Sequence, residues 1–176
     1  MADLFDRAER LMGMDDRVWR CHANPLSVAT RFSVLPLLAL AIWSRIWLGW
    51  GALLPVALVL VWTWANPRAF AEPRSFASWG SRAVLGERIF LNHRAEIPAH
   101  HRRVALCLGY AAALGALVLG LGLCMLWADW VVFGIVLTAL PKTWFCDRMV
   151  WIHDDWVRAG KAVPGLTAKE IAYDRL

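Results

Sequence analysis

The chain has 176 residues, of which 59% are hydrophobic, and a formal net charge of +5. Soluble domains contain about 45–50% apolar residues, so the composition predicts one all-α integral membrane domain over residues 1–176, with little length left for a soluble catalytic domain. The Lys and Arg residues are mixed with acids and flank apolar segments, which argues against nucleic acid as a partner.

The N-terminal segment, residues 1–20, is charged where a cleavable signal peptide would be apolar. Its apolar residues recur about one helical turn apart, which predicts an amphipathic helix on the cytoplasmic membrane surface. A solvated helix docked on protein is an equally good interpretation.

A first antiparallel hairpin is predicted over residues 26–64. Asn24 and Pro25 are suited to cap and begin its first span, which Pro36 is expected to bend because proline removes a backbone hydrogen bond. A short glycine-containing turn follows, and its brevity forces the second span, which ends near Trp64, to return antiparallel.

Two arginines lie near the ends of the first span, and we interpret Arg31 and Arg45 as anchors that reach the lipid headgroups. The Asn-Pro pair at Asn24 recurs at Asn66, where it predicts a turn after the second span, with Pro67 keeping the following chain extended.

The segment 66–103 is the largest polar stretch and is predicted to be a cytoplasmic loop. From Ser78 to about Asn92 its pattern predicts an amphipathic helix at the membrane interface, with Glu87 and Arg88 on the polar side.

A second antiparallel hairpin is predicted over residues 104–144, with its turn at Ala128 and Asp129. Its first span contains small residues at helical spacing that allow another helix to approach closely: Ala112, Gly115, Ala116 and Gly120. Either a neighbouring span or another subunit could be that helix.

Residues 145–176 are predicted to form an amphipathic helix and a tail, with a kink near Pro141 where the helix joins the last span. The apolar residues of this helix share one face: Phe145, Met149, Ile152 and Trp156. Thr167 and Glu170 have the spacing of a capping box for a last short helix.

Charge predicts the topology. Arg45 and Asp129 are nearly the only charges near the two short turns, whereas the N-terminus, the long loop and the C-terminus carry the rest. The positive-inside rule then gives four spans with both termini cytoplasmic, in the inner (plasma) membrane.

No catalytic residue, metal site or cofactor is predicted. The histidines lack the clustered spacing of membrane metal sites, and no Ser or Cys is paired locally with a base. The polar residues of interest form a candidate cluster or lipid-headgroup site: Asn66, Arg68, Glu87, Arg88, Lys142, Asp147, Arg148 and His153.

The motifs WANPRAF at 64–70, SRAVLGERIF at 81–90 and KTWFCDRMVWIHDD at 142–155 resemble a family of small multi-pass prokaryotic membrane proteins catalogued only as a domain of unknown function. The resemblance implies a membrane setting and a shared set of polar residues in these motifs. It implies no activity.

Two functions follow as hypotheses. The first is a non-catalytic accessory or assembly subunit of a larger membrane protein complex, with membrane lipids and another membrane protein or a second copy as partners. The alternative is a small membrane enzyme or carrier for a lipid or amphiphile at the cytoplasmic interface, where Asp147 or Glu87 would act as base or ion-pair partner. A structural role, in which Asp147 and Arg148 lock cytoplasmic helices together, competes with it.

Overall fold

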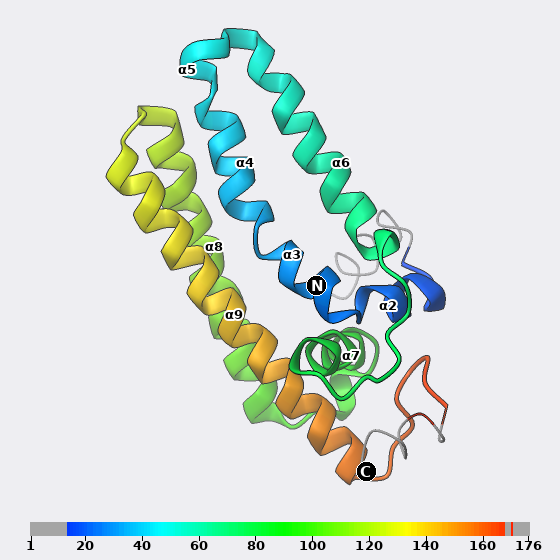
Figure 1. Ribbon diagram of the computed structural model, residues 1–176. Helices are drawn as coiled ribbons and strands as arrows, with labels where there is room; N and C mark the ends of the chain where they lie inside the picture. The colour runs from blue at the N-terminus through cyan, green and yellow to red at the C-terminus, as the bar shows by residue number, and fades with distance from the viewer. Residues whose placement is uncertain (1–13, 168–169, 171–176) are drawn as a thin grey trace.

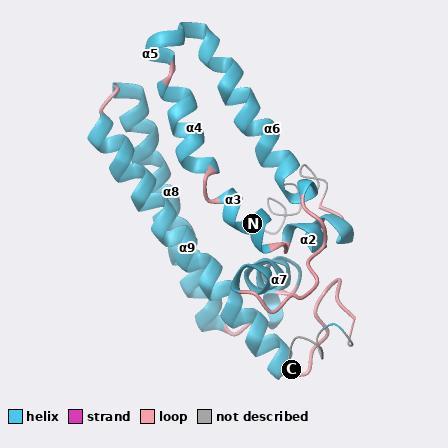
Figure 2. Ribbon diagram, viewed as in Figure 1, coloured by secondary structure: helices cyan, strands magenta, loops and turns pink. Residues whose placement is uncertain are grey.

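The computed structural model describes residues 14–167 and residue 170, and within this part every regular element is a helix, as Figures 1 and 2 show. The helices are α2 (Asp16–His22), α3 (Pro25–Arg31), α4 (Val34–Trp43), α5 (Arg45–Leu48), the 3₁₀ turn η1 (Gly49–Ala52), α6 (Leu53–Ala69), α7 (Trp79–Asn92), the 3₁₀ turn η2 (Arg94–Glu96), α8 (Ala99–Met125) and α9 (Ala128–Arg158). The all-α prediction is confirmed. Most of the predicted N-terminal amphipathic helix lies outside the described residues.

Three helical stretches are long and apolar enough to cross a membrane: residues 25–69, α8 and α9. The first stretch contains α3 to α6 and reverses direction at η1, so that α6 lies beside α4 (Figure 1). Few residues in the most apolar parts of these stretches are buried inside the protein.

The first stretch is interrupted rather than bent. Asn24 caps α3 by accepting a hydrogen bond from the N–H of Leu26, and Pro25 begins the helix, both as predicted. The chain leaves the α-helix at Phe32, immediately before α4, whose third residue is Pro36. Because Pro36 has no N–H to bond the carbonyl of Phe32, the break falls in the turn before the proline.

The predicted end of the next helix is wrong. α6 continues past Trp64 and through Pro67 to Ala69, and the extended backbone begins only at Phe70. Pro67 and Asn66 are both buried inside the protein. Pro67 is tolerated because it lies in the last turn of the helix, where its missing N–H costs one hydrogen bond and no later turn depends on it.

The central helix α7 begins after Ser78, which caps it through its side chain, and ends at Asn92, so the predicted bounds are confirmed. Most of its residues are buried, including Leu85 and Ile89, which are among the most deeply buried side chains of the described chain. The sequence indicates an amphipathic surface helix, but α7 lies at the centre of a compact base, which we define as α2, α7 and the adjacent ends of α3, α6, α8 and α9. In Figure 1 it is seen nearly end-on, crossing the direction of α9.

α9 is one continuous helix that runs through Pro141, and it packs against α8. The turn between them falls at Leu126, which adopts a left-handed conformation with φ 57°, two residues before the predicted position. The predicted apolar face of its C-terminal half is confirmed, since Met149, Ile152 and Trp156 are buried in the core of the base and Phe145 packs against it.

The two halves of the apolar region share a small core: Ala39 of α4 with Leu119, Leu123 and Val131 of α8 and α9. Arg45 also joins them, since its guanidinium donates to the carbonyls of Leu123 and Cys124 at the C-terminal end of α8. A cation is favourable there because the last helical carbonyls are unpaired, so Arg45 has an internal partner instead of the lipid headgroup expected from its position.

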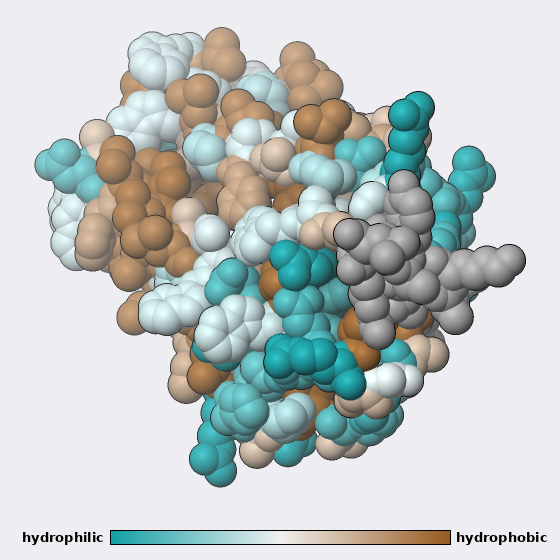
Figure 3. All heavy atoms as spheres, turned by 60° about the horizontal axis from the view of Figure 1, so that its bottom comes forward, coloured by the Kyte–Doolittle hydropathy of each residue, from teal (hydrophilic) through white to brown (hydrophobic). Residues whose placement is uncertain are grey.

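Figure 3 shows the base turned towards the viewer, with hydrophilic residues gathered on it and hydrophobic residues on the helices behind. The polar residues that the sequence singles out lie almost wholly in this base.

Candidate functional site

A chain of hydrogen bonds links helices α2, α3 and α6 within the base. His22 Nδ1 lies 3.1 Å from Ser27 Oγ, which donates to Asn66 Oδ1 at 3.0 Å, and Asn66 Nδ2 donates to Thr30 Oγ1 at 2.8 Å. Ser27 and Asn66 are fully buried, and His22 is nearly so. Burial keeps these groups bonded to one another, because an unpaired polar group there costs about 1–3 kcal/mol.

Arg31 sets the direction of this chain. Its Nη1 lies 3.3 Å from His22 Nε2, and since a guanidinium can only donate, Nε2 must accept. The ring proton of His22 therefore sits on Nδ1 and is donated to Ser27. Every donor then points the same way, from Arg31 towards Asn66 and Thr30.

The neutral state of His22 agrees with its surroundings. Burial, followed by the charge of Arg31, lowers the pKa of His22 from 6.5 to about 4. A protonated ring would have no acceptor for Arg31 and would place a second positive charge beside it.

The positive charge of Arg31 also acts on Glu87 of α7. Its carboxylate is 3.7 Å from Lys142 Nζ of α9, with 31% of the Glu87 side chain and 54% of the Lys142 side chain exposed. Burial alone would raise the pKa of Glu87, but the positive charges of Lys142 and Arg31 outweigh it and hold the pKa below its usual value. The base therefore brings two cations, one from each half of the molecule, to one carboxylate.

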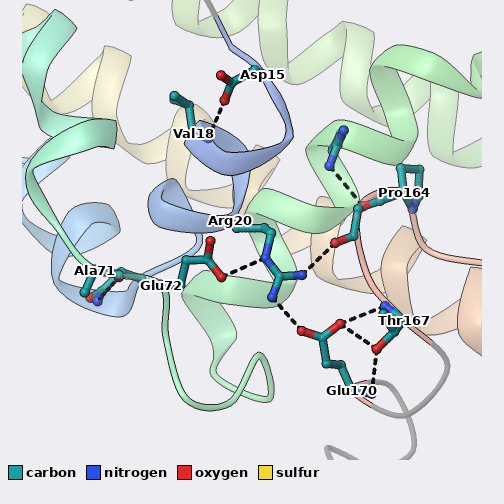
Figure 4. Close-up of polar contacts among 11 residues, drawn as sticks. Asp15, Val18, Arg20, Ala71, Glu72, Pro164, Thr167 and Glu170 are labelled. Atoms are coloured by element: carbon teal, nitrogen blue, oxygen red, sulfur yellow. Dashed lines mark hydrogen bonds and ion pairs between the residues drawn. The ribbon is translucent and has the colours of Figure 1, made fainter.

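A second polar cluster holds the C-terminal segment against α2 and α7 (Figure 4). Arg20 donates to Glu72 at 2.8 Å, to the carbonyl of Gly165 at 2.8 Å and to Glu170 at 2.5 Å. Thr167 completes the predicted capping box, because its N–H and hydroxyl both donate to Glu170 at 2.7 Å.

Arg88 belongs to this second cluster. It pairs with Asp16 and donates to the carbonyl of Pro164 at 3.1 Å. Gly165 lies directly against its guanidinium and has a φ of +78°, a conformation that favours glycine and leaves the arginine room.

A third group of polar residues lines α9. Asp147 accepts a hydrogen bond from Trp79 Nε1 of α7 at 3.1 Å, whereas the guanidinium of Arg148 lies over the ring of Trp151 at 4.3 Å. His153 Nδ1 lies 3.1 Å from Asp154, which also pairs with Arg82 at 3.1 Å. Two of these contacts, Trp79 with Asp147 and Arg82 with Asp154, join α7 to α9, and the other two lie within α9.

The structure thus brings together some of the predicted polar residues and separates the others. Glu87 and Lys142 are in contact, and Asn66 is linked through Ser27 and His22 to Arg31, whose charge acts on Glu87. Arg68 lies at the end of α6, over the ring of Trp64 at 4.3 Å. The remaining four, Arg88, Asp147, Arg148 and His153, belong to the second and third groups.

His22 and Ser27 were not among the residues predicted from the sequence, and Arg31 was predicted to be a lipid anchor. His22 stands two residues before the predicted cap Asn24, but no local pattern reveals that its partners come from α3 and, through Ser27, from α6. Within the described residues, no group of three His, Cys, Asp or Glu side chains is arranged to hold a metal ion.

The small residues of α8 point in two directions. Gly115 is buried against the backbone of Leu137 and Thr138 in α9, where an added Cβ would lie 2.5 Å from backbone atoms. Ala116 and Gly120 lie on another face, and a Cβ at Gly120 would meet nothing within 4 Å. The partner of Gly115 is therefore a helix of this chain.

Comparison with known proteins gives one match. A family model whose description is a family of unknown function matches residues 4–170. No curated protein and no solved structure matches the chain.

Proposed function

This chain belongs to the family of unknown function DUF6653, and we propose that it is a non-catalytic accessory or assembly subunit of a larger membrane protein complex. In this proposal the residue 25–69 stretch crosses the inner membrane twice and α8 and α9 once each, as two antiparallel hairpins. The base and both termini lie on the cytoplasmic side.

The distribution of charge supports this orientation. The base carries most of the arginines and lysines, whereas the turns at η1 and between α8 and α9 have Arg45 and Asp129 nearby and several exposed tryptophans. Cytoplasmic flanks are rich in Lys and Arg, and tryptophan is enriched at membrane interfaces.

The contacts of the polar residues favour a structural role over catalysis. Asp147, His153 and Arg88 each contact groups from other parts of the base or from their own helix, and they lie in two different groups. A catalytic acid, base and binding cation would need to converge on one place where a substrate could sit.

One observation carries the partner hypothesis: an outward-facing row of small residues on α8. Gly109, Ala113, Ala116 and Gly120 share one helical face that is turned away from α9, and nothing lies within 4 Å of a Cβ built at Gly109 or Gly120. In a membrane such a row lets a partner helix approach closely, where packing drives association. We define this row as the α8 small-residue face, and its proposed occupant is a transmembrane helix of another subunit.

The test is to enlarge this face without disturbing the fold. Ala116→Leu and Gly120→Leu are purified in mild detergent beside the wild type, and the assemblies are weighed by native mass spectrometry. Val61→Leu on the exposed face of α6 is the matched control, because it also adds apolar volume on a face that does not contact α8.

We expect the wild type and Val61→Leu to carry a stoichiometric second membrane protein, and both α8 variants to lose it while unfolding at the same temperature. Equal partner retention in all four proteins, or a wild type that carries only lipid, would contradict the proposal.

A further inference from the structure

Two cations, Arg31 and Lys142, act on one carboxylate, that of Glu87, between the two hairpins. We propose that Arg31 and Lys142 bind the phosphate of an anionic amphiphile, with its apolar part lying along the membrane-facing helices above. This site is independent of the α8 small-residue face.

Several cations of the base have a carboxylate partner of their own: Arg88 with Asp16, Arg82 with Asp154, and Lys161 with Glu96. Glu87 carries one negative charge and lies 3.7 Å from Lys142, and the positive charge of Arg31 acts on the same carboxylate. One positive charge is left over in a place that is half-buried, where an anion would balance it.

Arg31 is held in position by His22. Within the described residues its one hydrogen bond goes to His22, whose neutral ring is fixed in turn by the buried Ser27 and Asn66. A guanidinium has five N–H donors, and the others on Arg31 can bind a ligand. A guanidinium fixed in this way matches phosphate with two parallel hydrogen bonds and loses little freedom on binding.

The positions of Arg31 and Lys142 along their helices also suit an amphiphile. Arg31 ends α3 just before the apolar helix α4, and Lys142 follows the exposed apolar residues Val136 and Leu140 of α9. Trp144, also exposed, lies half a turn beyond Lys142. Both cations therefore stand where apolar surface gives way to polar surface, which suits a ligand with an anionic head and an apolar tail.

His22, Ser27 and Asn66 act in this proposal as positioning residues for Arg31. Ser27→Ala breaks the hydrogen-bond chain without removing a charge, so it should weaken phosphate binding less than Arg31→Gln does. Arg31→Lys keeps the charge but loses the planar fork, and its affinity should lie between those of the wild type and Arg31→Gln.

The test uses the full chain, purified and delipidated in detergent. Binding is followed by native mass spectrometry and by thermal stabilisation, with short-chain phosphatidic acid, phosphatidylcholine of the same chain length, and inorganic phosphate as separate probes. We expect saturable binding of phosphatidic acid that weakens at least about tenfold in Arg31→Gln, as for the loss of charge-assisted hydrogen bonds.

Arg68→Gln is the matched control for general attraction to the charged base, because Arg68 also stands at the base end of a membrane-facing helix. It should change the affinity less than about twofold, since long-range attraction between exposed charges is screened by salt. Equal losses in Arg31→Gln and Arg68→Gln would overturn the site.

Glu87→Gln supplies a variant that separates binding from folding. Removing the competing carboxylate should strengthen phosphatidic acid binding severalfold, whereas a purely structural cluster would gain nothing. If Arg31→Gln does not fold, unchanged or weaker binding by Glu87→Gln still overturns the proposal.

The probes also identify the source of the phosphate. Stabilisation by phosphatidic acid alone supports a lipid headgroup, and equal stabilisation by inorganic phosphate supports a free phosphate at the same residues. Binding of neither, or equal binding of phosphatidylcholine and phosphatidic acid, contradicts an anion site.

Discussion

Gly86 of α7 lies directly against the backbone carbonyl of Met149 in α9, so closely that a Cβ at this position would overlap the carbonyl oxygen. Met149 is itself fully buried in the core of the base. The close approach of these two residues sets how tightly α7 packs on α9, and with it the position of Glu87 beside Lys142.

Gly86→Ala should therefore destabilise the protein even though alanine favours helices. The methyl group meets a backbone atom that cannot rotate away, and overpacking of a core costs about 1–3 kcal/mol. The measurement is the unfolding midpoint in a denaturing detergent titration. Gly109→Ala is the control, because its methyl group meets nothing within 4 Å. Equal unfolding midpoints for both variants would show that α7 and α9 can move apart at Gly86 without a loss of stability.

Two glycines of the apolar hairpin should respond to alanine with opposite signs. At Gly134 of α9 an added Cβ would lie 2.4 Å from the backbone nitrogen of Leu119 in α8. An added Cβ at Gly120 would meet nothing within 4 Å. Gly120→Ala should stabilise the helix by up to about 1 kcal/mol through its better helix propensity. Gly134→Ala should destabilise the α8 and α9 pair, as measured by the same titration; stabilisation by both would contradict the packing.

Stability should depend on His22 in mildly acidic solution. The folded-state pKa of about 4 lies below the ordinary 6.5, so the unfolded chain takes up this proton first. The contribution of the neutral ring is complete above pH 6.5 and is lost as the pH falls towards 4, at most about 3 kcal/mol. Thermal unfolding between these pH values measures it.

His22→Gln should remove most of this pH dependence, while the exposed His100→Gln should keep it. The pKa of Glu87 is also lowered, so its own contribution is lost only below its usual range, as the carboxylate becomes protonated. A pH profile that is the same in His22→Gln and the wild type would show that His22 is not buried as a neutral ring.

The link between Arg20 and Glu170 should hold the C-terminal segment in place at neutral pH. The hydrogen bond from Arg20, followed by those from Thr167, lowers the pKa of Glu170 to about 2. Its stabilising effect is therefore present above the ordinary pKa of 4.5 and lost as the pH falls towards 2. Because the pair is partly exposed, the gain in global stability is small and salt-dependent.

Limited proteolysis after Lys161 measures this link locally. Glu170→Gln should speed cleavage severalfold at neutral pH and leave the unfolding temperature nearly unchanged. Glu96→Gln, which removes the ion-pair partner of Lys161 itself, controls for a direct effect on the cleaved residue. Unchanged cleavage in Glu170→Gln would show that the contact between Arg20 and Glu170, drawn in Figure 4, does not hold the C-terminal segment in place.

Features that depend on neighbours along the chain were predictable. Asn24, Ser78 and the Thr167 and Glu170 box act as caps because a cap is a bond between residues two or three positions apart. The buried face of α9 from Phe145 to Trp156 follows from helical periodicity alone. The three apolar stretches follow from composition over a length that a membrane requires.

Features that depend on distant residues were not. The Asn-Pro pairs at Asn24 and Asn66 look alike in the sequence, yet the first caps a helix while the second lies inside α6. The difference arises because Asn66 has buried partners, Ser27 and Thr30, which favour continuing the helix far enough to reach them.

By itself the sequence determined that this protein is helical, where it is apolar, and which end of each apolar helix carries charge, because these properties are sums over local residues. Only the tertiary structure decided that α7 is a core helix, that Gly115 and Gly120 face different surroundings, and that His22 pairs with Arg31 and Glu87 with Lys142. Those facts depend on how helices far apart in the chain cross, and a periodic pattern shows which face of a helix is apolar without showing what covers it.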